Sequence, residues 1–101
     1  MIKRGEIYTI NIASSKGKKV SALICSSDLI NETSGNVIIA PIATKLGTIY
    51  SFEYVIKDYG KVMCDQIRVV PISQVNEKVF SLSMRDMKQI DMILKIILGI
   101  S

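Results

Sequence analysis

The chain has 101 residues, 49% of them hydrophobic, which suits one small domain and suggests that another chain covers part of its apolar surface. Its 13 lysine and arginine residues outnumber its 9 aspartate and glutamate residues, and the net charge of +4 favours an acidic partner. The sequence contains no histidine, so acid and base chemistry near neutral pH falls to carboxylates, lysine, arginine, tyrosine or cysteine.

The first predicted elements form a hairpin. Residues 5–12 alternate Tyr8, Ile10 and Ile12 on one face, and residues 20–27 follow as a second strand after the polar link ASSKGKK. The loop between the two strands is therefore basic.

Three more strands are expected before the chain changes period. Residues 36–43 form an apolar, β-branched run, and residues 48–57 place Tyr50, Phe52, Tyr54 and Ile56 on one side. Gly60 then separates them from residues 61–70, which end at Pro71. The pattern thus predicts five strands.

The C-terminal segment has helical periodicity. Ser83 is a candidate N-cap with Asp86 at the third helical position. A helix beginning there has one broad apolar face, made of Met87, Ile90, Ile93, Leu94, Ile97 and Leu98. Met92 and Ile96 lie off this face, so we expect them to contact a second protomer or another partner, the alternative being two stray apolar residues on a surface. Closely spaced strands followed by one helix predict a mainly β domain with a C-terminal α-helix, built as a small bent sheet or barrel.

Polar residues interrupt what otherwise resembles a buried strand. Cys64, Asp65, Gln66 and Arg68 fall within five positions, and burying them is costly unless they are paired. This strand therefore lines a site or an interface. Apolar neighbours such as Met63 are expected to raise the pKa of Asp65 and make it a stronger base, while Arg68 is placed to pair with it.

Other features exclude several classes of protein. Cys25 and Cys64 lie in apolar runs without metal-ligand spacing, so we expect reduced thiols, no metal site and no cofactor. The N-terminus has no apolar signal region, and Lys95 breaks the C-terminal apolar run. We therefore expect a cytoplasmic protein with no membrane span.

Four segments, KRGEIYTINI, NVIIAPIAT, CDQIRVVP and a final helix ending in LGI, resemble the MazF/PemK/CcdB toxin superfamily in sequence and order. The resemblance spans nearly the whole chain and is nearest to MazF and PemK. It implies one toxin domain over residues 1–101, with a small SH3-like, CcdB-type barrel that forms a homodimer. It also implies an endoribonuclease of a type II toxin-antitoxin system, which cuts single-stranded RNA to 2′,3′-cyclic phosphate and 5′-hydroxyl ends and is held inactive by a cognate antitoxin.

The resemblance departs from the family at its catalytic positions. The family's Arg-Pro in the second strand corresponds to Val20 and Ser21, and its hydroxyl after Pro-Ile corresponds to Ala43, with Thr44 one residue late. The arginine of the PemK motif Arg-Cys-Asp-Gln corresponds to Met63, whereas the aspartate, which acts there as base, is kept as Asp65.

These residues give a predicted site. Asp65 would be the general base, Thr44 a donor to phosphate, and Lys19 a partial substitute for the arginine; Lys16, Lys18, Gln66 and Arg68 would bind RNA. The alternatives are a structural or interface role for Asp65 and Arg68, a solvated loop for the lysines, and a turn for Thr44.

Two other functions remain open at this point. The CcdB branch poisons DNA gyrase through the end of its helix, and the segments Val70-Pro71-Ile72-Ser73 and Leu98-Gly99-Ile100 resemble that branch. A catalytically degenerate relative would only bind an antitoxin or regulate its own operon.

Overall fold

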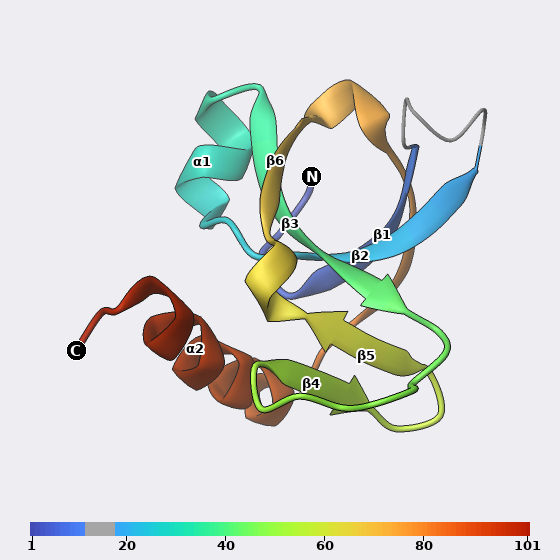
Figure 1. The fold of residues 1–101 in the computed structure, drawn as a ribbon. Helices are drawn as coiled ribbons and strands as arrows, with labels where there is room; N and C mark the ends of the chain where they lie inside the picture. Colours follow the sequence, from blue (N-terminus) through green and yellow to red (C-terminus); the bar gives the residue numbers. More distant parts are fainter. Residues whose placement is uncertain (12–17) are drawn as a thin grey trace.

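The computed structural model describes residues 1–11 and 18–101, and its strands curl into a strongly bent sheet with helix α2 packed at one side (Figure 1). Its elements in chain order are β1 (Glu6–Asn11), β2 (Lys19–Ile24), α1 (Asp28–Thr33), β3 (Asn36–Ala43), β4 (Glu53–Ile56), β5 (Gly60–Met63), η2 (Cys64–Gln66), β6 (Arg68–Pro71), η3 (Ile72–Gln74), β7 (Val75–Ser81) and α2 (Met84–Leu98). The predicted class, mainly β with a C-terminal helix, is confirmed.

Strand β3 organises the sheet because it pairs with three others. The strands run in the order β4-β5-β3-β2-β1-β7, and β6 also pairs with β3. The first half of β3 pairs with β6, and its last residues pair with β5. Among the described residues no ladder joins β4 to β7, so the predicted barrel is an open one.

The bent sheet separates two apolar cores, because successive strand residues point to opposite faces. Leu23 and Ala40 belong to the core that α2 covers, whereas Ile24 and Ile39 belong to the core enclosed by β1, β2, β3 and β6. The second core forms the floor of a pocket described below.

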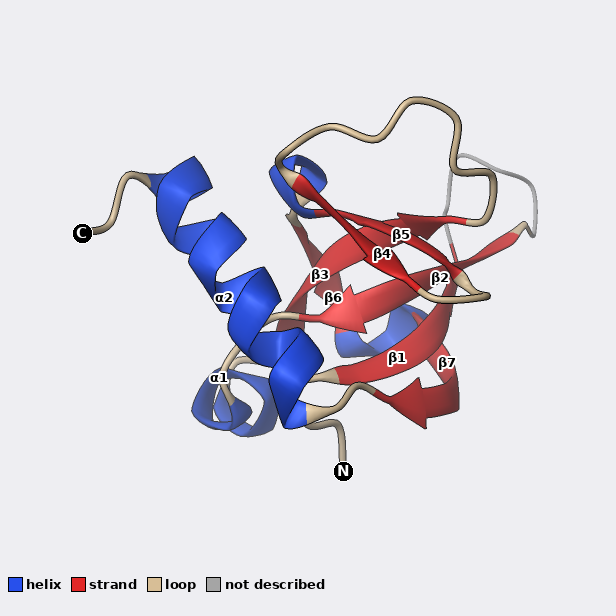
Figure 2. Cartoon of the chain, turned by 90° about the horizontal axis from the view of Figure 1, so that it is seen from below, coloured by secondary structure: helices blue, strands red, loops and turns tan. Residues whose placement is uncertain are grey.

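Helix α2 agrees with its sequence-based prediction. The Asp86 amide donates to the Ser83 Oγ atom at 3.1 Å, and Gly99 ends the helix in the left-handed conformation with φ of 70°. Ile90 is fully buried against the sheet, while Met92 and Ile96 are 59% and 79% exposed, as the helical pattern predicted. Figure 2 shows the C-terminal end of α2 projecting away from the strands.

Two predicted strands are wrong in extent. Residues 61–70 are not one strand, because the 3₁₀ turn η2 separates β5 from β6. Residues 48–57 contribute only β4, and Tyr50 and Phe52 lie in the loop before it. The turn gives the polar side chains of Asp65 and Gln66 access to solvent, which a continuous buried strand would deny them.

Two elements, α1 and β7, were missed. Strand β7, together with the division of residues 61–70 into β5 and β6, gives a sheet of seven strands among the described residues where five were predicted. Helix α1 has only six residues, too few to show helical periodicity, and its buried residue Asn31 is bonded to Ser26, just before the helix begins. The Asn31 amide donates to the Ser26 carbonyl at 3.1 Å, and its carbonyl accepts a short hydrogen bond from the Ser26 hydroxyl. Strand β7 carries charged residues on an edge of the sheet, which hides the alternation of its apolar residues.

Within the described parts of the chain, no helix is long and apolar enough to cross a membrane.

Candidate functional site

A pocket of about 320 Å³ opens between β2 and β6, and we call it the arginine pocket. Its lining residues are Ile10, Asn11, Val20, Ile39, Pro41, Arg68, Val69, Val70, Pro71 and Gln74. The β3–β6 register places Arg68 opposite Ile39, and the guanidinium side chain is exposed while the residues beneath it are buried.

The chemistry of the arginine pocket suits a phosphate. Arg68 supplies a permanent positive charge with several N–H donors, and the amides of Asn11 and Gln74 add neutral hydrogen-bonding groups. The apolar floor excludes water from one side of the pocket, while the exposed guanidinium remains accessible to an anion.

Val20 lies in this same pocket, on β2. This is the position where the resemblance places the family's catalytic arginine. Arg68 on β6 therefore brings a guanidinium to the pocket from a different strand. Ala43, at the position of the family's hydroxyl, ends β3 opposite Lys61 and has no polar side-chain atom.

Asp65 lies elsewhere, in turn η2, where it is exposed. The predicted placement of Asp65 in a strand among apolar neighbours is therefore wrong. The carboxylate lines a second cavity of about 390 Å³, which we call the aromatic pocket; its other lining residues are Ser51, Phe52, Ile93, Ile96 and Ile97. Within one protomer Asp65 also does not pair with Arg68, because the ion pairs among the described residues are Arg4–Asp91, Lys61–Glu53 and Lys78–Glu6.

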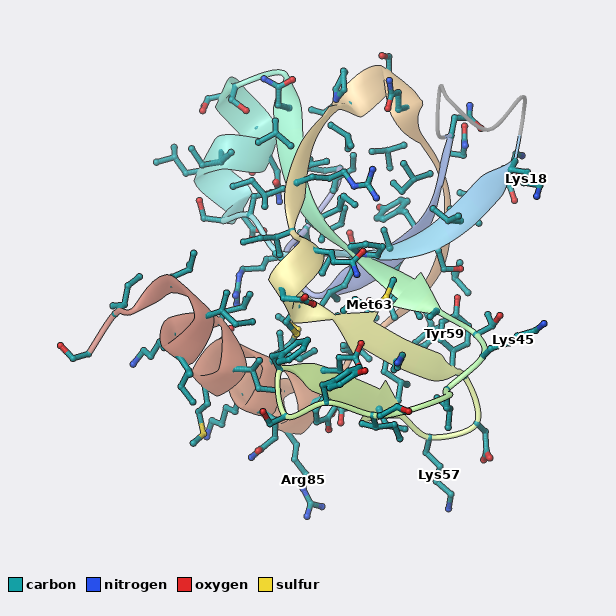
Figure 3. The ribbon with its side chains drawn as sticks, viewed as in Figure 1. Lys18, Lys45, Lys57, Tyr59, Met63 and Arg85 are labelled. Carbon is teal, nitrogen blue, oxygen red and sulfur yellow. The ribbon has the colours of Figure 1, made fainter. Side chains whose placement is uncertain are left out.

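The other predicted site residues are dispersed. Lys18 and Lys19 are exposed at the start of β2, and Lys16 lies outside the described residues. Thr44 follows β3 and lines a further pocket with Asp58 and Tyr59. In Figure 3, Lys18 and Met63 are well separated, with Met63 near the junction of β5 and η2. Among the described residues, one protomer thus does not bring Asp65, Thr44, Lys18 and Lys19 together.

The two cysteines do not supply a nucleophile. Burial raises the pKa of Cys64 to about 11 and the pKa of Cys25 to about 12, so both remain protonated near neutral pH. In the part of the chain that the structure describes, no cluster of three His, Cys, Asp or Glu side chains forms a metal site.

An aromatic pair beside the aromatic pocket was not predicted as part of a site. Tyr50 and Phe52 stack with ring centroids 5.2 Å apart and planes inclined by 6°. The ammonium of Lys61 lies 5.9 Å from the Tyr50 ring centroid and donates to the Thr48 carbonyl and to Glu53 at 2.8 and 2.9 Å. Alternating aromatic residues favoured a strand, but the bracing contacts of Lys61 hold this segment as a loop.

The chain matches a family model over residues 3–98, described as "PemK-like, MazF-like toxin of type II toxin-antitoxin system". No curated protein sequence matches it significantly. Solved structures with the same fold include a MazE-MazF complex from Deinococcus radiodurans, with TM-score 0.87, 20% identity, and coverage of 99% of this chain and 98% of the other.

Two mycobacterial structures are also similar. An endoribonuclease in complex with its cognate antitoxin from a Mycobacterial species has TM-score 0.85 and 17% identity, covering 99% of this chain and 95% of that one. The Mycobacterium tuberculosis toxin MazF-mt6 has TM-score 0.79 and 16% identity, covering 95% and 98%. At these identities the similarity establishes a shared fold.

Proposed function

Because the chain belongs to the PemK-like, MazF-like toxins of type II toxin-antitoxin systems, we propose that it is an endoribonuclease that cuts single-stranded RNA at the arginine pocket. The products would carry 2′,3′-cyclic phosphate and 5′-hydroxyl ends. The observation that supports this most directly is the position of Arg68, which lines the same pocket as Val20.

The reaction needs charge stabilisation above all. When the 2′-hydroxyl attacks its own phosphate, negative charge accumulates on the phosphorane oxygens, and two N–H groups of one guanidinium can bind two of these oxygens. Arg68 is the residue we assign to this role. Asn11 and Gln74 flank it in the pocket and can donate hydrogen bonds to the phosphate or ribose.

The exposed lysines are proposed to hold the RNA backbone rather than the reacting phosphate. Lys19 pairs across the β1–β2 ladder with Asn11, which lines the arginine pocket, and Lys18 precedes Lys19 in the chain. Lys16 would extend this basic segment. Gln66 is exposed two residues before Arg68 and can contact the same strand of RNA, while Thr44 would bind only an RNA segment that reaches beyond β3.

The test compares Arg68→Ala with Arg85→Ala, which removes the same charge from an exposed position on α2. On a long unstructured RNA, Arg68→Ala should reduce cleavage by about 10²- to 10³-fold, the range for losing one donor to a developing anion. Arg68→Lys should retain part of the activity, because it keeps the charge but loses the planar fork. Equal activities of the Arg68→Ala and Arg85→Ala variants would contradict the assignment.

A catalytically silent member of the family is the second candidate, and one observation favours it. Val20 and Ala43 put aliphatic side chains where the resemblance expects an arginine and a hydroxyl. Such a protein would bind a cognate antitoxin but leave RNA intact. If wild-type protein yields no fragments with cyclic phosphate ends while the Val20→Arg variant does, this second function is correct.

We propose two partners for this chain, a cognate antitoxin and a second copy of the chain itself. Similar solved structures contain antitoxins bound to their own toxins, and we propose a cognate antitoxin for this chain as well. We also propose a homodimer, because Leu98 and Ile100 line one groove and are 56% and 58% exposed, and Val69 on β6 is 62% exposed.

A further inference from the structure

The aromatic pocket has features of a ligand site that the proposed cleavage reaction does not use. Its volume of about 390 Å³ falls within the range of about 300 to 1,000 Å³ that is typical of small-molecule sites. Most of its lining is apolar, from Phe52 and three isoleucines of α2, and its polar groups are the Ser51 hydroxyl and the Asp65 carboxylate.

One wall of this pocket is braced in advance. Tyr50, which is 52% exposed, stacks on Phe52, and the Tyr50 amide donates to the Glu53 carboxylate at 3.0 Å. The same carboxylate oxygen accepts from Lys61, whose ammonium also binds the Thr48 carbonyl. Because these contacts fix the loop from both sides, little conformational entropy is lost when a flat ligand packs against Phe52.

The position of Asp65 restricts what the ligand can be. A carboxylate repels phosphate and accepts hydrogen bonds without donating them, so the part of the RNA that it binds must present N–H donors and carry no negative charge. Among the RNA bases, guanine presents two adjacent donors, N1–H and the N2 amine, that match the two oxygens of one carboxylate. Adenine, cytosine and uracil each present one such donor position on that edge.

We propose that the aromatic pocket binds one unpaired guanine of the RNA substrate. The base packs between Phe52 and the isoleucines of α2, and Asp65 accepts hydrogen bonds from its N1–H and N2 amine. This proposal rests on the proposed ribonuclease function and makes Asp65 a specificity residue. It also accounts for the presence of Asp65 in a pocket separate from Arg68.

A titration with mononucleotides tests the pocket without requiring cleavage. GMP, IMP and AMP are added to isotopically labelled protein, and chemical shifts are followed at Phe52 and at the Ile93 and Ile97 methyl groups. IMP is the matched probe, since it differs from GMP by the loss of the N2 amine. We expect GMP to shift these signals saturably and IMP to bind at least about ten-fold more weakly, which corresponds to the loss of one hydrogen bond to a charged group.

Variants then separate the two kinds of contact. Phe52→Ala should weaken GMP binding by about 5- to 150-fold, the range for one base stacked on an aromatic side chain. Phe52→Leu keeps the pocket filled and serves if the alanine variant does not fold. Asp65→Asn should abolish the preference for GMP over IMP. Leu29→Ala, on exposed α1, should change neither quantity.

Cleavage provides an independent readout. In an RNA with varied sequence around the cut, Asp65→Asn should retain cleavage but lose the preference for guanine. A folded Asp65→Asn variant that loses more than about 100-fold of its activity at every site would instead show that Asp65 is a general base. Equal binding of GMP, IMP and AMP, or no shifts at the pocket, would also overturn the guanine proposal. If GMP binds selectively but wild-type protein never cuts RNA, the ribonuclease function fails while the base pocket stands.

Discussion

Arg68 and Val20 show how one pocket can receive its charge from a different strand. The two side chains come from β6 and β2, yet both line the arginine pocket because β3 pairs with each of these strands. The arginine side chain is long enough for its guanidinium to reach a phosphate in the pocket from either β2 or β6. A substitution at Val20 therefore does not by itself remove the cation that a phosphorane requires.

Glu6 is a residue for which the structure predicts a pH effect on stability. Burial raises the pKa of its carboxyl, but hydrogen bonds from Lys78, Lys3 and Tyr8 and the Lys78 charge outweigh burial, and the pKa lies below its usual 4.5. Because the pKa of Glu6 is lower in the folded state, its ionised carboxylate stabilises the protein at pH values above the ordinary pKa of 4.5. This stabilisation is lost as the pH falls through the pKa of the folded state.

We therefore expect Glu6→Gln to lower the urea midpoint at pH 7, and the difference from wild type to shrink as pH falls below 4.5. Urea unfolding measured across this range is the test. Glu32→Gln, an exposed substitution on α1, is the matched control. A difference that stays constant from pH 7 into the acid range would show that Glu6 contributes through packing rather than charge.

At the scale of elements, the break between β5 and β6 determines where the polar residues point. The sequence of residues 61–70 is apolar and β-branched enough to predict a strand, and Asp65 and Gln66 are the signal that it is interrupted. A 3₁₀ turn of three residues has no periodicity of its own. The sequence therefore indicates that polar residues do not fit a buried strand here, but it does not show that a turn replaces the strand. The same local limit explains why six-residue α1 was missed, whereas α2 was predicted from its cap and its repeating face.

Gly60 gives a prediction for the β3–β5 junction. A Cβ atom at this position would lie 2.5 Å from the Ala43 carbonyl oxygen, and the strands cannot separate without breaking their ladder. We expect Gly60→Ala to reduce the free energy of unfolding by about 1 to 3 kcal/mol, as overpacking of a tight contact does.

Thermal unfolding would show this as a loss of about 4 to 8 °C per kcal/mol for a domain of this size. Gly35→Asn serves as the control, because a Cβ at Gly35 meets nothing within 4 Å and asparagine tolerates its φ of 77°. A Gly60→Ala melting temperature equal to that of the control would mean that β3 and β5 adjust more freely than the contact suggests.

For the whole molecule, the fold was more predictable than the site. The hairpin, the central strand and the final helix depend on local periodicity and on a family resemblance that spans the chain. The site depends on which strands the bent sheet brings together around one pocket, and local sequence patterns do not predict that arrangement. Arg68 was predicted to bind RNA but its pocket with Asn11 and Gln74 was not, because Gln74 belongs to a turn after β6.

The arrangement of the whole chain also explains why 49% of its residues are hydrophobic. Val69, Leu98 and Ile100 are more than half exposed, and the last two line a groove that also contains Ile38, Ile67 and Leu94. Arg4, Asp91 and Lys95 lie at this groove, which gives an apolar centre with charged groups around it, as protein interfaces have. Because the sheet edge at β6 is adjacent, a second copy of the chain can cover β6 and the end of α2 together.

We expect the protein to sediment at about twice its chain mass of 11.2 kDa, and Leu98→Glu to shift it to the monomer by placing a charge in the apolar centre of the interface. Met84→Glu is the matched control: it introduces the same charge at the opposite end of α2, on a side chain that is 81% exposed. Sedimentation equilibrium over a micromolar concentration series distinguishes the two variants. If Leu98→Glu remains a dimer, the groove does not form the interface; a wild-type protein that is monomeric throughout would mean that these apolar residues are covered by another partner.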